Sequence, residues 1–159
     1  MRPLSVRLAS ADDSDAIARL INSAKADTLV SEVDVQDRAE RIRSLIEAGQ
    51  NIQFIAEGGG EVVGEIALAL GHPAPASLGL SVRPDWRRRG VASALIEEAV
   101  TWAQSHDVHK LSVEVFPEND AALSLLGKHG FEEEGRLKGH FQRIAGKPRD
   151  AISLGRRLA

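Results

Sequence analysis

The chain has 159 residues, of which 43% are hydrophobic and 27% charged, a balance typical of one soluble globular domain. Its 20 Lys and Arg against 23 Asp and Glu give a formal net charge of −3, which argues against binding to nucleic acid phosphates. The absence of Cys excludes disulfides, thiolate nucleophiles and Cys-bound zinc, and the absence of Tyr excludes a phenol as catalytic acid.

Apolar residues alternate or recur in patterns that divide the first half of the chain into strands and helices. The predicted strands cover residues 4–8, 51–57, 61–70 and 77–83. Between the first two strands, helical spacing predicts one helix from Ser10 to Ala24 and a second that begins at Asp34 and ends at Gly49. The glycines at 58–60 predict a hairpin turn, and Pro84 ends the fourth strand.

The second half returns to helical spacing at Gly90, and this helix is expected to end near His106. A strand follows over residues 110–116, and Asn119 then caps a helix that stops at Gly130. The last two predicted strands cover residues 131–138 and 149–157.

The predicted order is therefore β-α-α-β-β-β-α-β-α-β-β. It describes one α/β domain over residues 1–159, with a mixed central sheet and helices on both faces. The first half of the sheet is antiparallel, and the second half contains a β-α-β crossover. No stretch reaches the roughly 20 apolar residues of a membrane span, and the first residues lack the apolar run of a signal peptide. A cytoplasmic protein with no membrane partner is expected.

The most informative segment joins the fourth strand to the following helix and reads Arg-Pro-Asp-Trp-Arg-Arg-Arg-Gly-Val-Ala. The first amides of a helix lack partners within the helix and carry the positive end of its dipole. Small residues at Gly90 and Ala92 let an anion approach these amides, and Arg87, Arg88 and Arg89 add positive charge. The pattern is typical of a phosphate or pyrophosphate site, although a solvated helix start with a glycine chosen for packing explains it equally well. P-loop and dinucleotide-binding motifs are absent.

Two motifs resemble signatures of the GNAT acetyltransferase superfamily. The segment 87–92, Arg-Arg-Arg-Gly-Val-Ala, matches Arg/Gln-x-x-Gly-x-Gly/Ala. The segment 119–131, Asn-Asp-Ala-Ala-Leu-Ser-Leu-Leu-Gly-Lys-His-Gly-Phe, is similar to Asn-x-x-Ala-x-x-Leu-Tyr-x-x-x-Gly-Phe. The closing Leu-Gly-Arg-Arg-Leu at 154–158 resembles the same family, and the element order agrees over nearly the whole chain.

The resemblance implies that acetyl-CoA binds at the basic turn, with its pyrophosphate on the amides of residues 88–92. The strand carrying Leu80 and Val82 would pair its backbone with the pantetheine arm and splay from strand 110–116, which leaves a gap for the thioester. An amide near Leu80 would polarise the thioester carbonyl. The cofactor-binding residues that the resemblance implies are Leu80, Val82, Arg87, Arg88, Arg89, Gly90, Val91, Ala92 and Asn119.

Glu114 is the first candidate for the base that takes a proton from an acceptor amine. It precedes Asn119 by five residues, at a position where protein N-terminal acetylating relatives carry a glutamate. An exposed strand carboxylate paired with a Lys or Arg explains the same residue. Four other residues are alternatives for the base: His72, Glu65, Asp85 and Glu118.

The residue at the position of the family's general acid departs from the family pattern. Leu126 occupies the position where the family carries the Tyr that protonates the departing thiolate, so solvent or another side chain would take this role. Asn119, a candidate catalytic residue, either hydrogen-bonds the pantetheine or an ordered water, or serves only as a helix cap. The histidines of the second half show no metal-ligand spacing with carboxylates, so no metal site is expected.

The expected function is an acetyl-CoA-dependent N-acetyltransferase that acetylates a primary amine by direct transfer in a ternary complex. The acceptor would be a small molecule, an amino acid or a protein N-terminus. The alternatives are an acyl-CoA-binding sensor or degenerate domain of the same fold, and a nucleic-acid binder that uses the three arginines. Acceptor specificity is expected to lie in the two early helices and in loops 71–77 and 139–149. By analogy, Phe141 and Arg143 in the second of these loops are candidates to line the acceptor site. A homodimer is common among proteins that look like this one.

Overall fold

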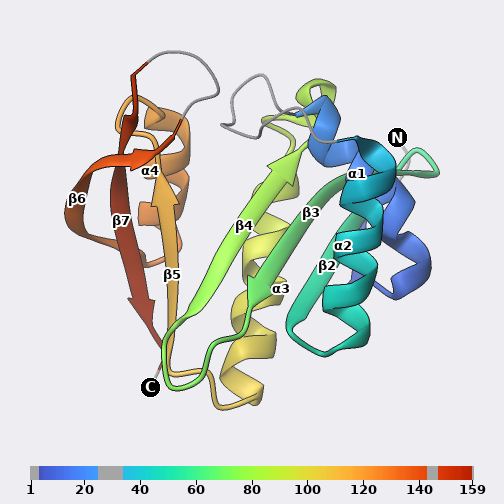
Figure 1. Cartoon of the computed structure of the whole chain (residues 1–159), viewed down its shortest axis with the longest axis horizontal. Coiled ribbons are helices and arrows are strands. Elements are labelled where there is room, and N and C mark those ends of the chain that lie inside the picture. The colour runs from blue at the N-terminus through green and yellow to red at the C-terminus, as the bar shows by residue number, and fades with distance from the viewer. Residues whose placement is uncertain (1–3, 25–33, 143–146, 159) are drawn as a thin grey trace.

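The computed structural model describes residues 4–24, 34–142 and 147–158 (Figure 1). They form a mixed seven-stranded sheet with the strand order β1-β2-β3-β4-β5-β7-β6. The strands are β1 (Ser5–Leu8), β2 (Asn51–Gly58), β3 (Glu61–Ala69), β4 (Ala76–Val82), β5 (Lys110–Val115), β6 (Glu132–Phe141) and β7 (Arg149–Arg157). The helices are α1 (Ser14–Ser23), α2 (Val35–Glu47), α3 (Val91–Ser105) and α4 (Asp120–Lys128), with the short 3-10 helices η1 (Ala11–Asp13) and η3 (Pro84–Trp86). The predicted element order and α/β class are confirmed.

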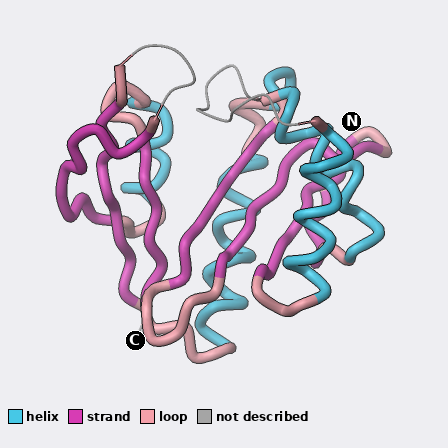
Figure 2. Tube along the Cα trace, in the orientation of Figure 1, coloured by secondary structure: helices cyan, strands magenta, loops and turns pink. Residues whose placement is uncertain are grey.

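Helices cover both faces of the sheet, as predicted. Figure 2 shows α1 and α2 in front of the strands and α3 behind them. Each face has its own apolar core. The larger core joins the sheet to α3 and α4 and includes Leu95, Ile96 and Leu111, whereas the smaller one joins it to α1 and α2 around Ile17 and Ile55. The face under α1 and α2 also holds buried polar groups, which are described below.

Local capping sets where two of the helices begin. The Asp34 carboxylate accepts a hydrogen bond from the Gln36 amide at 2.9 Å at the start of α2. The Asn119 side-chain carbonyl accepts one from the Ala122 amide at 3.2 Å at the start of α4. Both caps satisfy amides that have no partner inside the helix, and both were predicted from residue type and position.

Several boundaries shift by one residue, and three differences concern the hairpin turn, the basic loop and β6. Gly58 belongs to β2, so the hairpin turn contains Gly59 and Gly60 alone. The basic loop before α3 includes the 3-10 helix η3, which is favoured by Pro84 in its first turn. Strand β6 extends to Phe141, although residues 139–141 were assigned to a loop. The reason is a contact with the neighbouring strand, because the Asp150 carboxylate on β7 accepts the Gly139 amide at 2.8 Å.

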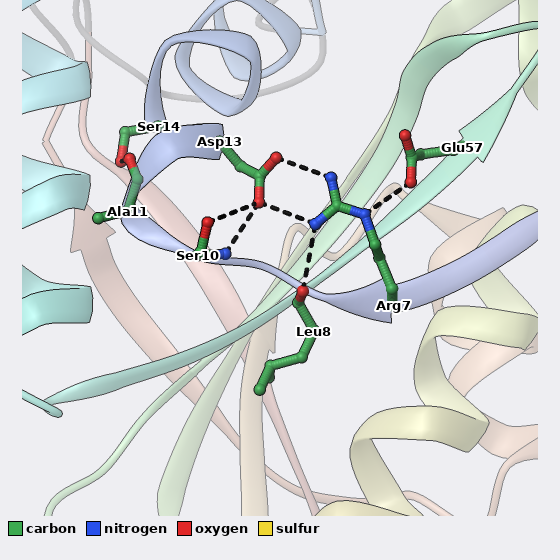
Figure 3. A network of polar contacts seen from close by, with 7 residues as sticks. All are labelled: Arg7, Leu8, Ser10, Ala11, Asp13, Ser14 and Glu57. Atoms are coloured by element: carbon green, nitrogen blue, oxygen red, sulfur yellow. Dashed lines mark hydrogen bonds and ion pairs between the residues drawn. The ribbon is translucent and has the colours of Figure 1, made fainter.

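An ion-pair network ties β1 to η1 and β2 (Figure 3). The Arg7 guanidinium donates to both Asp13 carboxylate oxygens, at 3.0 and 2.8 Å, and to Glu57 Oε1 at 2.7 Å. Asp13 also accepts the Ser10 amide at 2.8 Å, which caps η1. The Arg7 guanidinium is the main reason that the pKa of Asp13 lies below its usual value. The network therefore stabilises the fold while Asp13 is ionised.

We expect Asp13→Asn to lower the free energy of unfolding by about 1–2 kcal/mol at neutral pH, because a charge-assisted pair and part of a cap are lost. A carboxylate with a lowered folded pKa stabilises the fold above its unfolded pKa, and this contribution disappears as the pH falls through the folded value. The difference between variant and wild type should therefore shrink below about pH 4. Urea unfolding at pH 7 and at about pH 3 measures it, with Asp12→Asn as the control. An equal difference at both pH values would contradict the ion-pair account.

Candidate functional site

Strands β4 and β5 separate soon after they pair. Their parallel ladder is confined to Ala76 opposite Leu111 and Ser77 opposite Ser112. On its other edge β4 stays paired with β3 as far as Val82. Residues 78–82 therefore have an unpaired edge toward β5, and Figure 1 shows the two strands diverging. A splayed parallel pair inside a sheet leaves backbone donors and acceptors open for a ligand.

The register identifies which amides of β4 face this gap. The Arg83 amide donates to the Val63 carbonyl of β3 at 2.8 Å, so it points away from β5. Successive backbone groups of a strand point to opposite edges. The amides and carbonyls of Leu80 and Val82 therefore point into the gap. These are the two backbone positions that the sequence singled out on this strand.

The basic turn after β4 contains two residues with left-handed backbone angles. Arg88 has φ 62° and Gly90, which caps α3, has φ 81°. Alternation of left- and right-handed residues curls successive N–H groups around one point, which is a common anion-binding arrangement. The first amides of α3, at Val91 and Ala92, extend this set at the positive end of the helix dipole.

A glycine is needed at position 90 for its backbone angle and not for close packing. A Cβ placed on Gly90 would meet no atom within 4 Å among the described residues. Its φ of 81° lies where L side chains are rarely found. The interpretation of Gly90 as a packing glycine is therefore wrong, and the turn conformation is what requires it.

Close packing on the sheet places this turn at the open end of the gap. Gly64 of β3 lies opposite Val82, the last residue of β4. A Cβ on Gly64 would come within 2.7 Å of the Val91 side chain and 3.0 Å of the Leu95 side chain. The first turns of α3 therefore rest directly on β3 at the level of Val82, so the helix amides and the gap face the same region.

Trp86 links the basic turn to the β2–β3 hairpin. A Cβ on Gly58 would lie only 2.6 Å from the Trp86 indole, so the ring is seated against the bare backbone of β2. The Arg89 guanidinium lies 4.9 Å above the centre of the same ring, within cation–π range. The hairpin thus sets the position of Trp86, and Trp86 sets that of Arg89.

We expect Gly58→Ala to weaken the binding of a pyrophosphate-containing ligand to the basic turn about two- to fivefold, which corresponds to the loss of one exposed cation–π contact. The added methyl group displaces the indole, and Arg89 moves with it. Calorimetric titration measures the affinity, and circular dichroism checks the fold. Gly127→Ala is the matched control, since a Cβ there meets nothing within 4 Å in the described structure. If the two variants bind equally well, Trp86 does not position Arg89.

Glu114 lies across the gap from β4. Its side chain is exposed, whereas the alternate residues Val113 and Val115 face the core under α3 and α4. Glu114 therefore points to the opposite face of the sheet, the face of α1 and α2. Asn119 caps α4 through its side-chain carbonyl, which leaves the amide NH₂ for another partner. Leu126 is buried in the core with 3% of its surface exposed.

The other candidate bases lie in different settings. His72 is in the loop before β4, at the end where β4 and β5 are still paired, so it is far along the strand from the gap's open end. Asp85 forms an ion pair with Arg83, and Glu118 forms one with Arg149. Glu65 is buried with 3% exposure. It lies on β3 opposite Ser81, beside the gap.

Two aromatic residues gather near the end of β5. The Phe141 ring lies 5.2 Å from the Phe116 ring in an edge-to-face arrangement. The Arg149 guanidinium stacks over the Phe116 ring at 3.7 Å. Phe141 therefore lies close to the end of the strand that carries Glu114, while Arg143 lies outside the described residues.

Sequence reasoning missed the surroundings of Glu65. Gln53 Nε2 donates to Glu65 Oε2 at 3.0 Å, and Arg38 of α2 acts on the same carboxylate through its charge. These residues come from three elements that are distant in sequence, and no local spacing connects them. The one feature of the sequence that could have indicated this buried group is Glu65 itself, a charged residue within an otherwise largely apolar strand.

The described residues contain no group of three or more His, Cys, Asp or Glu side chains arranged to hold a metal ion. In the same part of the chain, no helix has the length and apolar character needed to cross a membrane.

Comparison with known proteins shows that the chain is similar to acetyltransferases. Residues 17–131 match the family model described as "Acetyltransferase (GNAT) family". The "Putative phosphinothricin acetyltransferase YwnH" of Bacillus subtilis (strain 168) is 29% identical over 165 residues, which cover 98% of this chain and 100% of that protein. The L-amino acid N-acetyltransferase AaaT of Escherichia coli (strain K12) is 33% identical over 91 residues, or 54% of this chain and 56% of its own.

A solved structure described as "a putative phosphinothricin N-acetyltransferase" superposes on this one with a TM-score of 0.84. It is 30% identical and the superposition covers 99% of each chain. The family match includes β4, the basic turn, β5 and α4, which are the elements that frame the gap.

Proposed function

Because this chain belongs to the GNAT acetyltransferase family, we propose that it transfers the acetyl group of acetyl-CoA to a primary amine by direct attack in a ternary complex. The observation that carries the proposal is the gap between β4 and β5, which opens beside the first amides of α3. An unpaired strand edge next to a helix N-terminus offers backbone partners for an extended arm that ends in a phosphate group.

The residues of the basic turn fit the pyrophosphate of coenzyme A. Arg88 and Gly90 adopt the left-handed angles that curl the amides together, and Arg87 and Arg89 add positive charge around them. Gly90, Val91 and Ala92 contribute the amides at the positive end of α3. When bound, acetyl-CoA supplies an activated acetyl thioester.

The remaining roles follow from the directions of groups on β4 and α4. The Leu80 amide, which faces the gap, donates a hydrogen bond to the thioester carbonyl oxygen and stabilises negative charge that develops there. Val82 offers its backbone groups to the amides of the pantetheine arm. The Asn119 amide NH₂ hydrogen-bonds the same arm or a water molecule, while its carbonyl holds the start of α4.

Glu114 accepts the proton that the acceptor amine must lose before it can act as a nucleophile. Its exposed carboxylate lies on the face of α1 and α2, the face opposite the helix whose amides hold the pyrophosphate. The two substrates would therefore meet in the gap from opposite sides of the sheet. Leu126 cannot donate a proton, so water protonates the departing thiolate.

The acceptor is a small primary amine in this proposal, and an amino acid or a similar compound is the first choice. Relatives named for phosphinothricin and for L-amino acids support this choice over a protein N-terminus. We place the protein in the cytoplasm, in keeping with its use of acetyl-CoA.

An acceptor screen tests the proposal. Purified protein with acetyl-CoA is offered amino acids, phosphinothricin, polyamines, aminoglycosides and N-terminal peptides, and free thiol release is followed. We expect one group of small amines to stimulate release well above the rate without acceptor, and mass spectrometry should find the acetylated amine. Release that no amine stimulates would overturn the proposal.

An acyl-CoA-binding protein with little catalysis is the second candidate. The observation that favours it is Leu126, an aliphatic residue at the position where the family carries a phenol. Its side chain is buried in the core. Calorimetry separates the two functions. Binding of acetyl-CoA without transfer to any amine in the screen supports the binding protein, whereas transfer supports the enzyme.

A further inference from the structure

A group of buried polar side chains lies under α1 and α2, beside the gap. Glu65 of β3 is 3% exposed and accepts a hydrogen bond from Gln53 of β2, which is also 3% exposed. Arg38 of α2 reaches toward them and donates through Nε to Asn22 Oδ1 at 2.7 Å. Ser81 of β4 lies directly opposite Glu65 in the β3–β4 register and hydrogen-bonds its carboxylate.

This group of buried polar side chains lowers the stability of the fold. In the described part of the chain, Gln53 Oε1 and Arg38 Nη2 are buried without a hydrogen-bond partner. A buried polar atom without a partner loses its hydrogen bonds to water and gains none in exchange, which destabilises the fold. Burial also raises the pKa of Glu65 to about 7 against the opposing effects of Gln53, Ser81 and Arg38. A core built only for stability would hold apolar residues at these positions.

Ser81 connects the buried carboxylate to the gap. Residues 77, 79 and 81 of β4 and residues 112 and 114 of β5 share the face of α1 and α2, because Ser77 and Ser112 are paired and side chains alternate along a strand. Gly79 and Glu114 each lie two positions beyond that pair on their own strand. Gly79 has no side chain, and a Cβ there would meet nothing within 4 Å in the described structure. The open space beside Gly79 therefore lies on the same face of the sheet as the half-buried Ser81 and the exposed Glu114.

We propose that Glu65, acting through Ser81, is a positioning residue that holds the ammonium group of the acceptor in this space, so that the site selects cationic primary amines. The inference rests on the proposed function and adds an acceptor-binding role to it. The ionised Glu65 accepts a hydrogen bond from the Ser81 hydroxyl group, which turns the Ser81 lone pairs toward the gap. An N–H of the ammonium group then donates to Ser81 Oγ, and Glu114 takes the proton from another N–H.

The protonation of Glu65 controls this arrangement. A protonated Glu65 donates to Ser81, so Ser81 presents a proton to the gap, and the buried negative charge is lost. Among the described residues the charged group that faces Glu65 is Arg38 of α2, which favours the ionised form. Gln53 of β2 and Ser81 of β4 are neutral, and the buried residues of α1 carry no titratable group. The KM for the amine should therefore rise as the pH falls through about 7.

Glu65→Gln tests the inference, because it removes the charge and keeps the shape. We expect the KM for the amine to rise about five- to tenfold at pH 8, which is the usual effect of losing one hydrogen bond assisted by charge. The dependence of the KM on pH near 7 should disappear. The affinity for acetyl-CoA should remain unchanged, and kcat at saturating amine should stay within about twofold.

Stability and titration give readouts that do not depend on turnover. The unfolded carboxyl ionises at a lower pH than the buried one, so the contribution of Glu65 to the stability of the fold falls as the pH rises from about 4.5 to 7. Glu65→Gln should therefore be at least as stable as the wild type at pH 8, although it binds the amine less well. Carbon-13 NMR of labelled protein without substrates should place the pKa of Glu65 near 7, and Ser81→Ala should raise it.

Ser81→Ala is the second variant and Ser77→Ala the matched control on the same face of β4. Ser81→Ala should raise the KM for the amine as Glu65→Gln does, whereas Ser77→Ala should not. If the wild type is active and either Glu65→Gln or Ser81→Ala has the same KM for the amine as the wild type, this inference is overturned and the proposed function stands. A wild type that acetylates no amine overturns both.

Discussion

Glu114→Gln is expected to lower kcat/KM by about 10²- to 10⁴-fold at neutral pH, which is the usual contribution of a general base. The amide keeps the size of the side chain and much of its hydrogen bonding, so the change isolates basicity. Glu114 is exposed on a strand paired with β7, and no core packing is lost. The loss should become smaller at high pH, where more of the amine is already neutral.

Steady-state kinetics between about pH 6 and pH 10 measure this effect, with acetyl-CoA saturating. Glu133→Gln is the matched control, because Glu133 is an exposed carboxylate on β6, away from the gap. Full activity of Glu114→Gln at every pH would show that Glu114 is an ordinary surface carboxylate of β5. The base would then have to be a water molecule or Glu65.

The same experiment also separates the two carboxylates that flank the gap. Loss of Glu114 should reduce kcat and leave the pH dependence of the amine KM in place, since that dependence belongs to Glu65. Loss of Glu65 should change the KM and leave kcat nearly intact. Leu126→Tyr adds a possible proton donor, and it should leave the affinity for acetyl-CoA unchanged.

Gly90→Glu is expected to weaken acetyl-CoA binding at least tenfold, or about 1.4 kcal/mol. Two physical effects combine. A side chain at φ 81° strains the turn that gathers the amides, and the carboxylate repels the pyrophosphate at the positive end of α3. A Cβ at this position meets nothing within 4 Å among the described residues, so the fold should be retained.

Calorimetry on a series of variants separates strain from charge. Gly90→Ala introduces the strain alone, and Gly90→Lys introduces the same strain with the opposite charge. We expect affinity to fall least in Gly90→Lys, more in Gly90→Ala and most in Gly90→Glu. Gly135→Glu is the control for added charge, because a Cβ at Gly135 also meets open space in the described structure. Unchanged affinity in Gly90→Glu would move the pyrophosphate away from this turn.

The sequence by itself determined the elements and the position of the basic turn. Caps and apolar spacing are local, since a helix start needs only a residue such as Asp34 or Asn119 and the amides that follow it. Alternation along a strand is equally local, and it placed β5 and β7 within a residue of their observed bounds. The basic turn was found for the same reason, because its arginines, its glycine and the first amides of α3 are contiguous in the chain.

Only the tertiary structure decided which of these groups lie in contact with one another. Contacts between distant segments pack Trp86 against Gly58 and α3 against Gly64. A contact of the same kind, between Asp150 and Gly139, accompanies the extension of β6. The buried group around Glu65 depends on β2, β3, β4 and α2 meeting in one place. Residue spacing along the chain does not predict which distant segments come into contact, because strand register and helix packing are set by the core as a whole.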